Sequence, residues 1–366
     1  MTTSRKSRQN PLVREFILNS VEEHPADIVA FAAKEFQLSR AAVNKYVKRL
    51  IDEKFLTATG KTYARRYGLA AISENYAAFD VTKNMSENDI WRDNVLPYIK
   101  DLPSNVVDIC QYGFTEMFNN VIDHSESEKA YVFYEQTPKW VKISVLDEGI
   151  GIFEKIQKDF NLADPRSALL ELSKGKLTSD STRHSGEGVF FTSRMFDEFS
   201  IKSGHLLYVK TKKIDFEWLI GTEDIMEYYK GTSIIMKISP SASWTTNDIY
   251  QLFQDDGYRF AKTHVPIELG RYPGEQLVSR SQAKRVLARV ARFSEVLLDF
   301  HGVQQIGQAF ADEIFRVFQN EHPEVRLIAM RTSAEIDQMI VRVKAGGESQ
   351  GLDALAAAST PVEKPS

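Results

Sequence analysis

TEMFNNVIDHS, at residues 115–125, is the stretch from which the fold of this chain follows. Around it apolar residues recur every three or four positions, which predicts an amphipathic helix. Glu116 and Asn120 are four residues apart, so a helix presents them on one face, and His124 extends that face. A carboxylate and a carboxamide that project together can hold Mg²⁺ and a water, because hard cations take oxygen ligands. Taken alone, the pattern also fits a solvated polar stripe.

A second stretch, DEGIGI at residues 147–152, follows an alternating run at 142–146. The run predicts a strand that enters a turn at Asp147. A buried carboxylate at a strand end can accept a hydrogen bond from an exocyclic amine such as that of adenine. Gly149 and Gly151 allow backbone conformations that a side chain would block. An ordinary Asp-Gly turn is the alternative for this stretch on its own.

A third stretch, SGEGVFF at residues 185–191, places Gly186 and Gly188 before an expected helix at 189–196. A glycine-rich turn at a helix N-terminus presents backbone N–H groups to phosphate. A flexible loop that ends at a helix cap is the alternative. The sequence contains no G-x-x-x-x-G-K-[ST] motif, so it has no P-loop. In this order, the three stretches predict an ATP pocket of another kind.

Together the three stretches resemble the N, G1 and G2 boxes of the GHKL ATPase superfamily, over roughly residues 86–240. This superfamily includes gyrase-type ATPases, MutL, histidine kinases and anti-sigma-factor serine kinases. The resemblance implies the Bergerat ATP-binding fold, with ATP and Mg²⁺ as ligands. Asp123 is similar to the residue that gyrase and MutL have at this position. His124, four residues after Asn120, is similar to the pattern of the anti-sigma serine kinases.

The resemblance also implies roles for individual residues. Glu116 would orient or deprotonate the attacking nucleophile, Asn120 would ligate Mg²⁺, and Asp147 would bind adenine. The other residues that it places around the nucleotide are His124, Gly149, Gly151, Gly186, Gly188 and Thr232. Segment 153–185 would be the ATP lid. The third box departs from the family pattern because Phe190 stands where the last glycine would be.

Four basic side chains in the polar part of the expected lid could neutralise a triphosphate: Lys174, Lys176, Arg183 and His184. A loop of this length is usually either functional or disordered. The sequence leaves open which of the four contacts phosphate.

The composition, 43% hydrophobic and 26% charged, is typical of a globular protein of two or three domains. No apolar run is long enough to span a membrane, and the N-terminus lacks the apolar core of a signal peptide. Cys110 is the single cysteine, which excludes an internal disulfide, and no Cys/His cluster has zinc spacing. We therefore expect a cytoplasmic protein in which Cys110 is a packed thiol.

The first domain is basic. Residues 1–66 contain 13 Lys and Arg against 7 Asp and Glu, whereas the rest contains 33 against 43. This asymmetry suggests a segregated nucleic-acid function, although so modest an excess also arises by chance. Apolar periodicity and turn residues predict three helices and a hairpin, at 11–22, 26–36, 40–54 and 55–63. Three helices followed by a wing resemble a winged helix-turn-helix, which we assign to residues 1–70.

The third helix of that domain is expected to enter the major groove of a nucleic acid. Its candidate contact residues lie off the apolar face: Arg40, Asn44, Lys45, Lys48 and Arg49. Phosphate contacts would make such binding strongly salt-dependent. The alternative is a winged helix that serves protein contacts or dimerisation, with solvated cations.

The central domain, residues 101–240, is expected to contain a sheet. Alternating residues predict strands at 130–136, 140–146, 199–203, 206–212 and 233–238. Helices expected at 105–124 and 187–196 would cover one face of the sheet, giving a two-layer α/β sandwich. Residues 71–100 are expected to be a connector that ends in a lead-in helix.

The C-terminal domain, residues 241–343, is expected to be a small α/β domain. A strand at 295–300, a helix and a strand at 325–330 suggest a parallel sheet. The motif LLDF with the helix that follows resembles STAS-like domains, relatives of anti-sigma-factor antagonists. In that family a phosphorylatable serine opens the helix, whereas residues 307–309, GQA, carry no hydroxyl. We therefore expect a docking or sensing module.

Two further segments carry weaker signals. The basic helix at 280–292 is expected to present a solvated face, with docking on the acidic body as the alternative. The tail, residues 344–366, is rich in Gly, Ala, Ser and Pro and is expected to be disordered.

Taken as a whole, the sequence predicts a multidomain α/β protein that regulates transcription, binds DNA through residues 1–66, and uses Mg-ATP as a conformational switch. A serine/threonine kinase of the anti-sigma type is the first alternative, and an ATP-binding module without catalysis is the second. Residues 67–105 contain no histidine, which argues against an autophosphorylating histidine kinase. A regulatory protein partner and a homodimer are both compatible with these functions.

Overall fold

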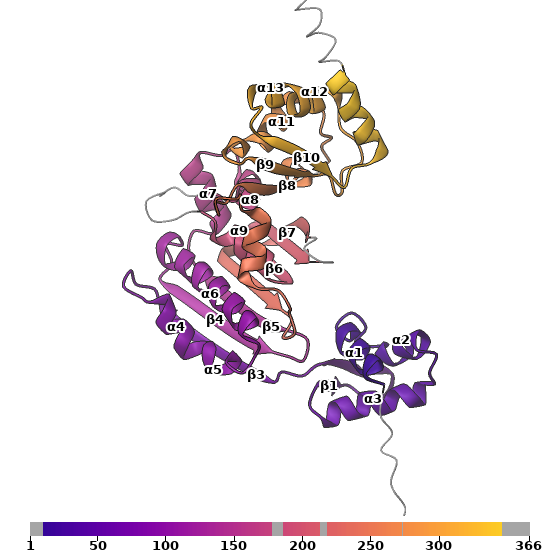
Figure 1. Cartoon of the computed structure of the whole chain (residues 1–366). Helices are drawn as coiled ribbons and strands as arrows, with labels where there is room; N and C mark the ends of the chain where they lie inside the picture. Colours follow the sequence, from indigo (N-terminus) through magenta and orange to yellow (C-terminus); the bar gives the residue numbers. More distant parts are fainter. Residues whose placement is uncertain (1–9, 178–185, 213–217, 273, 346–366) are drawn as a thin grey trace, which may run out of the picture.

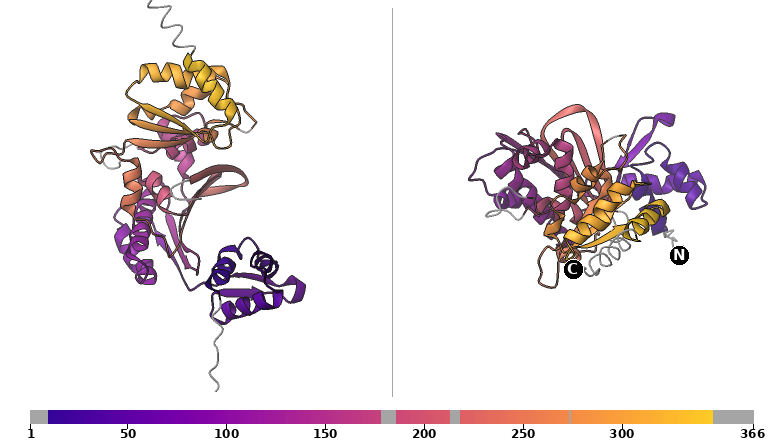
Figure 2. Two further views of the ribbon diagram at one scale, coloured as in Figure 1. Left: turned by 45° about the vertical axis from the view of Figure 1, so that its right-hand side comes forward. Right: turned by 90° about the horizontal axis from the view of Figure 1, so that it is seen from above.

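The computed structural model describes residues 10–177, 186–212, 218–272 and 274–345, which form three units in chain order. Figures 1 and 2 show a central sandwich of one sheet and several helices, with an N-terminal three-helix unit at one end and a C-terminal α/β unit at the other. None of the helices in these ranges combines the length and the apolar character that crossing a membrane requires.

The N-terminal unit contains three helices and a two-stranded antiparallel sheet: α1 Pro11–Ser20, α2 Ile28–Glu35, α3 Arg40–Asp52, β1 Leu56–Thr59 and β2 Arg66–Leu69. The Ser39 hydroxyl accepts a hydrogen bond from the Ala42 amide at 3.1 Å, so Ser39 caps α3 as its position predicts. The hairpin extends beyond the expected 55–63, because β1 pairs with β2 across a turn that contains Gly60 at φ +73°. The unit has an apolar core of its own.

The central sheet has the strand order β3-β4-β5-β7-β6, and every neighbouring pair is antiparallel. Its strands are β3 Ser73–Asp80, β4 Lys129–Gln136, β5 Val141–Asp147, β6 Glu198–Lys212 and β7 Trp218–Ile238. The two strands expected at 199–203 and 206–212 form one strand, β6, with an irregular register at Gly204. The expected connector is also corrected, because β3 pairs with β4 along its whole length as an edge strand.

Helices cover one face of this sheet (Figure 1): α4 Glu87–Asn94, α5 Leu96–Ile99, α6 Ser104–His124 and α9 Gly188–Met195. The apolar side of α6, from Val106 to Val121, is buried in the core. This arrangement confirms the predicted two-layer sandwich. Cys110 lies on that apolar side, fully buried, and its burial raises the pKa of the thiol.

The expected lid begins with two helices, α7 Ile152–Phe160 and α8 Pro165–Lys174. The Asp164 carboxylate accepts a hydrogen bond from the Ser167 amide at 2.8 Å and so caps α8. Residues 178–185 of the expected lid, with Arg183 and His184, lie outside the described residues.

The C-terminal unit is built on a parallel sheet with the order β10-β9-β8. The strands are β8 Lys262–Pro266, β9 Glu295–Asp299 and β10 Arg326–Met330. The helical segments are α10 Thr246–Phe253, η2 Ile267–Gly270, α11 Arg280–Leu287, η3 Val290–Arg292, α12 Gln308–Asp312, η4 Glu313–Phe318 and α13 Gln319–Glu321. The predicted parallel pair β9–β10 is confirmed, whereas β8 is an addition. Residues 334–345 are helical, so the expected disorder is wrong at 344–345, and the remaining tail lies outside the described residues.

The apolar core of the central sandwich continues into the C-terminal unit. Phe260 contacts Phe190 of α9 and Phe293, with ring centroids 4.6 and 5.2 Å apart. The expectation of a solvated basic helix at 280–292 is wrong for Arg289, whose guanidinium pairs with a carboxylate of α8 at 3.0 Å. The two units therefore share one core and a polar interface.

Candidate functional site

A cavity of about 380 Å³ lies between α6, the end of β5, the part of β7 around Thr232, the start of α9, and the helices α7 and α8. This volume falls within the range of small-molecule sites. Eight of the nine residues expected around a nucleotide line this cavity: Glu116, Asn120, His124, Asp147, Gly151, Gly186, Gly188 and Thr232. Residues up to about a hundred positions apart in the sequence therefore meet at one place.

Asp147 ends β5 and is 4% exposed. Its Oδ1 accepts hydrogen bonds from the amide of Gly149 at 2.9 Å and from the amide of Thr232 at 3.3 Å. Burial raises the pKa of this carboxyl group, and the two amide bonds act in the opposite direction. The result is a rigidly held acceptor in the wall of the cavity, suited to an exocyclic amine.

Gly149 is the ninth residue, and it does not belong to the lining. A Cβ at Gly149 would overlap the main-chain carbonyl of Ser125, where α6 ends. The next amide, that of Ile150, donates to this same carbonyl at 2.9 Å. Gly149 therefore holds the turn after β5 against the end of α6, which brings Asp147 beside the polar face of that helix.

Glu116 lies against the N-terminus of α9. A Cβ at Gly188 would overlap the Glu116 carboxylate, so a glycine is needed for this close approach. Burial raises the pKa of Tyr112, one helical turn before Glu116, and the charge of Glu116 raises it further. Tyr112 also meets Tyr250 of α10 edge to face at 6.0 Å. Neither tyrosine was predicted from the sequence to lie near Glu116, although the spacing of Tyr112 from Glu116 places it on the same helical face.

The oxygen atoms that the protein places in the cavity suit a Mg²⁺ ion whose other coordinating oxygens come from a bound ligand and water. Asn120 supplies a carboxamide oxygen next to the Glu116 carboxylate along one face of α6. Within the described ranges, no group of three or more His, Cys, Asp or Glu residues could hold a metal ion. Mg²⁺ typically retains waters and binds through one or two protein groups plus phosphate oxygens, and Asn120 fits that role.

Lys155 is a cation in the cavity lining that was not predicted from the sequence. It lies on α7 and pairs with Glu126 at 3.1 Å and with Asp159 at 3.4 Å. The hydrogen bond to Glu126 is the main cause that raises the pKa of Lys155. Lys155 lies one helical turn after Gly151, but this spacing became informative only once α7 was known to be a helix beside the cavity.

The two described lid lysines do not face the cavity as phosphate ligands would. Lys174 is 1% exposed, and its Nζ lies 2.7 Å from Glu171 and 2.9 Å from the carbonyl of Ala288. Lys176 donates to the carbonyl of Arg292 at 3.1 Å. Both side chains contact the C-terminal unit, so of the four basic residues that could neutralise a triphosphate, these two are directed elsewhere.

The five candidate nucleic-acid contacts on α3 are all exposed: Arg40, Asn44, Lys45, Lys48 and Arg49. Arg49 pairs with Glu53 at 2.7 Å, so part of its charge is compensated. The apolar side of α3, including Val43, Val47 and Leu50, is buried in the N-terminal core. The helix therefore presents a polar, largely basic face to solvent.

Two family models match the chain. One describes a histidine kinase-like ATPase domain and matches residues 94–210, and the other describes a STAS-like domain of unknown function and matches residues 282–337. The chain therefore carries a GHKL-type ATPase domain and a C-terminal STAS-like domain, as the resemblances implied. A comparison with curated proteins gives no match. The first matched range contains seven of the eight lining residues named above and ends before Thr232.

Proposed function

We propose that this protein binds Mg-ATP in the cavity below α6 and uses it as a conformational switch in a cytoplasmic regulator that binds DNA. The observation that carries the proposal is the convergence on one cavity of Asp147, Asn120 and the two glycines at the start of α9. The buried carboxylate at one end of the cavity matches the base of a nucleotide, and the helix N-terminus at the other end matches its phosphates. The matched ATPase-type family supports the same ligand.

Each part of the cavity has a task in this proposal. Asp147 accepts a hydrogen bond from the exocyclic amine of adenine and disfavours guanine, which presents a carbonyl oxygen at that position. The backbone amides after Gly186 and Gly188 face the phosphates. Asn120 holds Mg²⁺, which neutralises phosphate charge when it is bound. Glu116 orients a nucleophile and accepts its proton.

The nucleic-acid function rests on the N-terminal unit. Three helices followed by a two-stranded wing form a winged helix-turn-helix in this proposal, with α3 as the recognition helix. The exposed cations Lys45 and Lys48 on α3 and Arg66 at the start of β2 support this assignment.

Purified protein incubated with ATP labelled at the γ-phosphate tests the catalytic part. We expect labelled inorganic phosphate, released at a rate that depends on Mg²⁺. Label on a separate protein, added as a cell extract, would instead identify a protein kinase. If the protein binds ATP and neither label is found, the domain is a binding module, and the proposed hydrolysis is wrong.

A further inference from the structure

The outer side of α8 carries a buried charge cluster at the boundary with the STAS-like domain. Glu171 is 5% exposed, and its two carboxylate oxygens lie 2.7 Å from Lys174 Nζ and 3.0 Å from Arg289 Nη1. Arg289 belongs to the loop between α11 and η3, at φ +63°. Figure 1 shows α8 beside the edge strand β8 of the C-terminal sheet, and α7 packs against α8. Because these ion pairs are removed from water, they are favourable only when the two units occupy one relative position.

Hydrogen bonds from side chains to main-chain carbonyls reinforce the contact at the end of α8. The buried hydroxyl of Thr263, on β8, donates to the carbonyl of Lys174 at 2.7 Å. Lys176 donates to the carbonyl of Arg292, and Arg292 donates back to the carbonyl of Lys176 at 3.2 Å. The STAS-like domain is thus hydrogen-bonded to the last turn of α8 and to the two residues that follow it.

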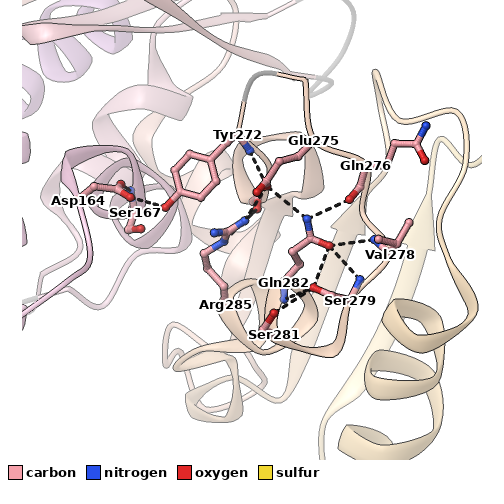
Figure 3. A network of polar contacts seen from close by, with 11 residues as sticks. Asp164, Ser167, Tyr272, Glu275, Gln276, Val278, Ser279, Ser281, Gln282 and Arg285 are labelled. Atoms are coloured by element: carbon pink, nitrogen blue, oxygen red, sulfur yellow. Dashed lines mark hydrogen bonds and ion pairs between the residues drawn. The ribbon is translucent and has the colours of Figure 1, made fainter.

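The first turn of α8 is held as well (Figure 3). The Tyr272 hydroxyl bonds to Asp164, the residue that caps α8. Arg285 of α11 lies over the Tyr272 ring at 4.5 Å and donates to the carbonyl of Gly270 at 3.0 Å. Both ends of this lid helix are therefore fastened to the same domain.

The inner side of the same helices forms the wall of the nucleotide cavity. Phe160 of α7, Leu172 of α8 and Leu177 line it. The guanidinium of Arg289 lies over the Phe160 ring at 4.7 Å. One side chain of the STAS-like domain therefore contacts both the buried cluster behind the lid and an aromatic ring that borders the cavity.

We propose that the STAS-like domain sets the nucleotide affinity of the ATPase-type domain by clamping its lid, with Arg289 as the main link. This inference rests on the proposed function, because it takes the cavity to be the ATP site. Docking holds α7 and α8 in place before ATP arrives, so binding does not have to order them. Thermodynamic linkage requires that bound nucleotide strengthen the docking of the STAS-like domain on the lid by the same factor by which docking strengthens nucleotide binding. A partner that displaces the STAS-like domain must therefore weaken ATP binding.

Arg289→Ala in the full-length protein tests the clamp. Glu171 keeps Lys174 as its partner in this variant, so no carboxylate is left buried without a cation. We expect the Kd for a non-hydrolysable ATP analogue, measured by calorimetry, to rise about fivefold or more. Thr263→Val, which removes a bond remote from the cavity, is expected to shift the Kd in the same direction. Lys284→Ala is the matched control, since this exposed side chain of α11 pairs within its own domain.

Hydrogen exchange on the same proteins separates the clamp from the proposed function. Without nucleotide, amides of residues 166–177 should exchange faster in Arg289→Ala than in the wild type, and adding the analogue should slow their exchange in the wild type. If the wild type binds no analogue, the proposed function fails, whatever the exchange shows. If the wild type binds the analogue and Arg289→Ala gives an unchanged or lower Kd, the clamp is wrong and the ATP site stands.

Discussion

Asp147 illustrates how neighbouring backbone shapes a single side chain. Its carboxylate is buried at a strand end, yet two amides bond to it, from the turn that follows β5 and from Thr232 across the sheet. Glu116 differs, because it lies on the polar face of α6 beside the start of α9. Two carboxylates in one cavity thus occupy separate environments, in keeping with the separate roles proposed for them in recognition and in proton transfer.

Replacing Glu116 by Ala should therefore remove catalysis and spare binding. We expect ATP hydrolysis to fall by about two to four orders of magnitude, since a positioned general base contributes roughly that much. The Kd for ATP should stay within about threefold of the wild type. Steady-state phosphate release and calorimetry measure the two quantities, and Glu128→Ala, at an exposed position beyond α6, is the control. Undiminished hydrolysis would refute the role of Glu116.

Asp299 in the STAS-like domain should control acid stability. Burial tends to raise its pKa, but hydrogen bonds from His264 and Arg331 outweigh burial and lower the pKa to about 2. Because the folded pKa lies below the unfolded value of about 4, the stabilisation is present above that value and is lost as the pH falls toward about 2.

Urea unfolding of Asp299→Asn at a series of pH values checks this expectation. The variant should be less stable than the wild type near neutral pH, and the difference should shrink as the pH falls below about 4. Asp80→Asn, at an exposed position, is the control. A difference that is constant across the whole pH series would show that Asp299 does not titrate as described.

The residues around the cavity illustrate what the sequence could and could not reveal. Helical spacing was enough to group Glu116, Asn120 and His124, because a helix fixes which side chains share a face. Gly149 was expected to line the cavity, yet it packs against the Ser125 carbonyl behind the cavity. A glycine in a motif indicates a close approach but does not say which part of the backbone approaches. Lys155 was missed because its place in the lining depends on how α7 crosses the end of the sheet.

At the scale of elements, long helices and strands with a clear apolar period were predictable from the sequence, and the edge strand was not. α6 has a complete apolar side, so its position and buried face followed from the sequence. β3 alternates only between half-buried and exposed side chains, which is a weak signal for an edge strand. The docking of α8 was not predictable, because it depends on partners about a hundred residues later.

Helix α3, the proposed recognition helix, gives a prediction at this scale. Lys45→Glu combined with Lys48→Glu should weaken binding to DNA and should reduce the slope of log K against log salt by about one for each phosphate that α3 no longer neutralises. Lys34→Glu, on the exposed side of α2, is the matched charge reversal that should change neither quantity. Fluorescence anisotropy with a pool of random duplexes at several salt concentrations measures both. Equal affinities for all three proteins would refute nucleic-acid binding by α3.

At the scale of the whole molecule, two apolar cores divide the described chain. One belongs to the three helices of the N-terminal unit, and the other runs from the central sheet into the STAS-like domain. The N-terminal unit meets the sandwich through polar contacts such as those of Lys139 with Asn19 and of Trp140 with Glu22. A shared core couples the ATPase-type and STAS-like domains far more strongly than such contacts can.

Calorimetric unfolding should therefore show two transitions. Phe260→Ala, in the core between the two larger domains, should destabilise the larger transition by about 3 kcal/mol and leave the smaller one in place. Val13→Ala, in the N-terminal core, is the reciprocal control and should affect the smaller transition only. A separate third transition for the STAS-like domain in the wild type would contradict the shared core.

Calorimetric titration of Mg-ATP into the wild type and Asp147→Asn tests the central claim most directly, with Asp80→Asn as a control. We expect one ATP per chain, no measurable heat with GTP, and a Kd about 10- to 100-fold higher in Asp147→Asn, since a hydrogen bond to a charged group is lost. Absence of heat with ATP in the wild type, or equal Kd values in all three proteins, would contradict an ATP site at this cavity.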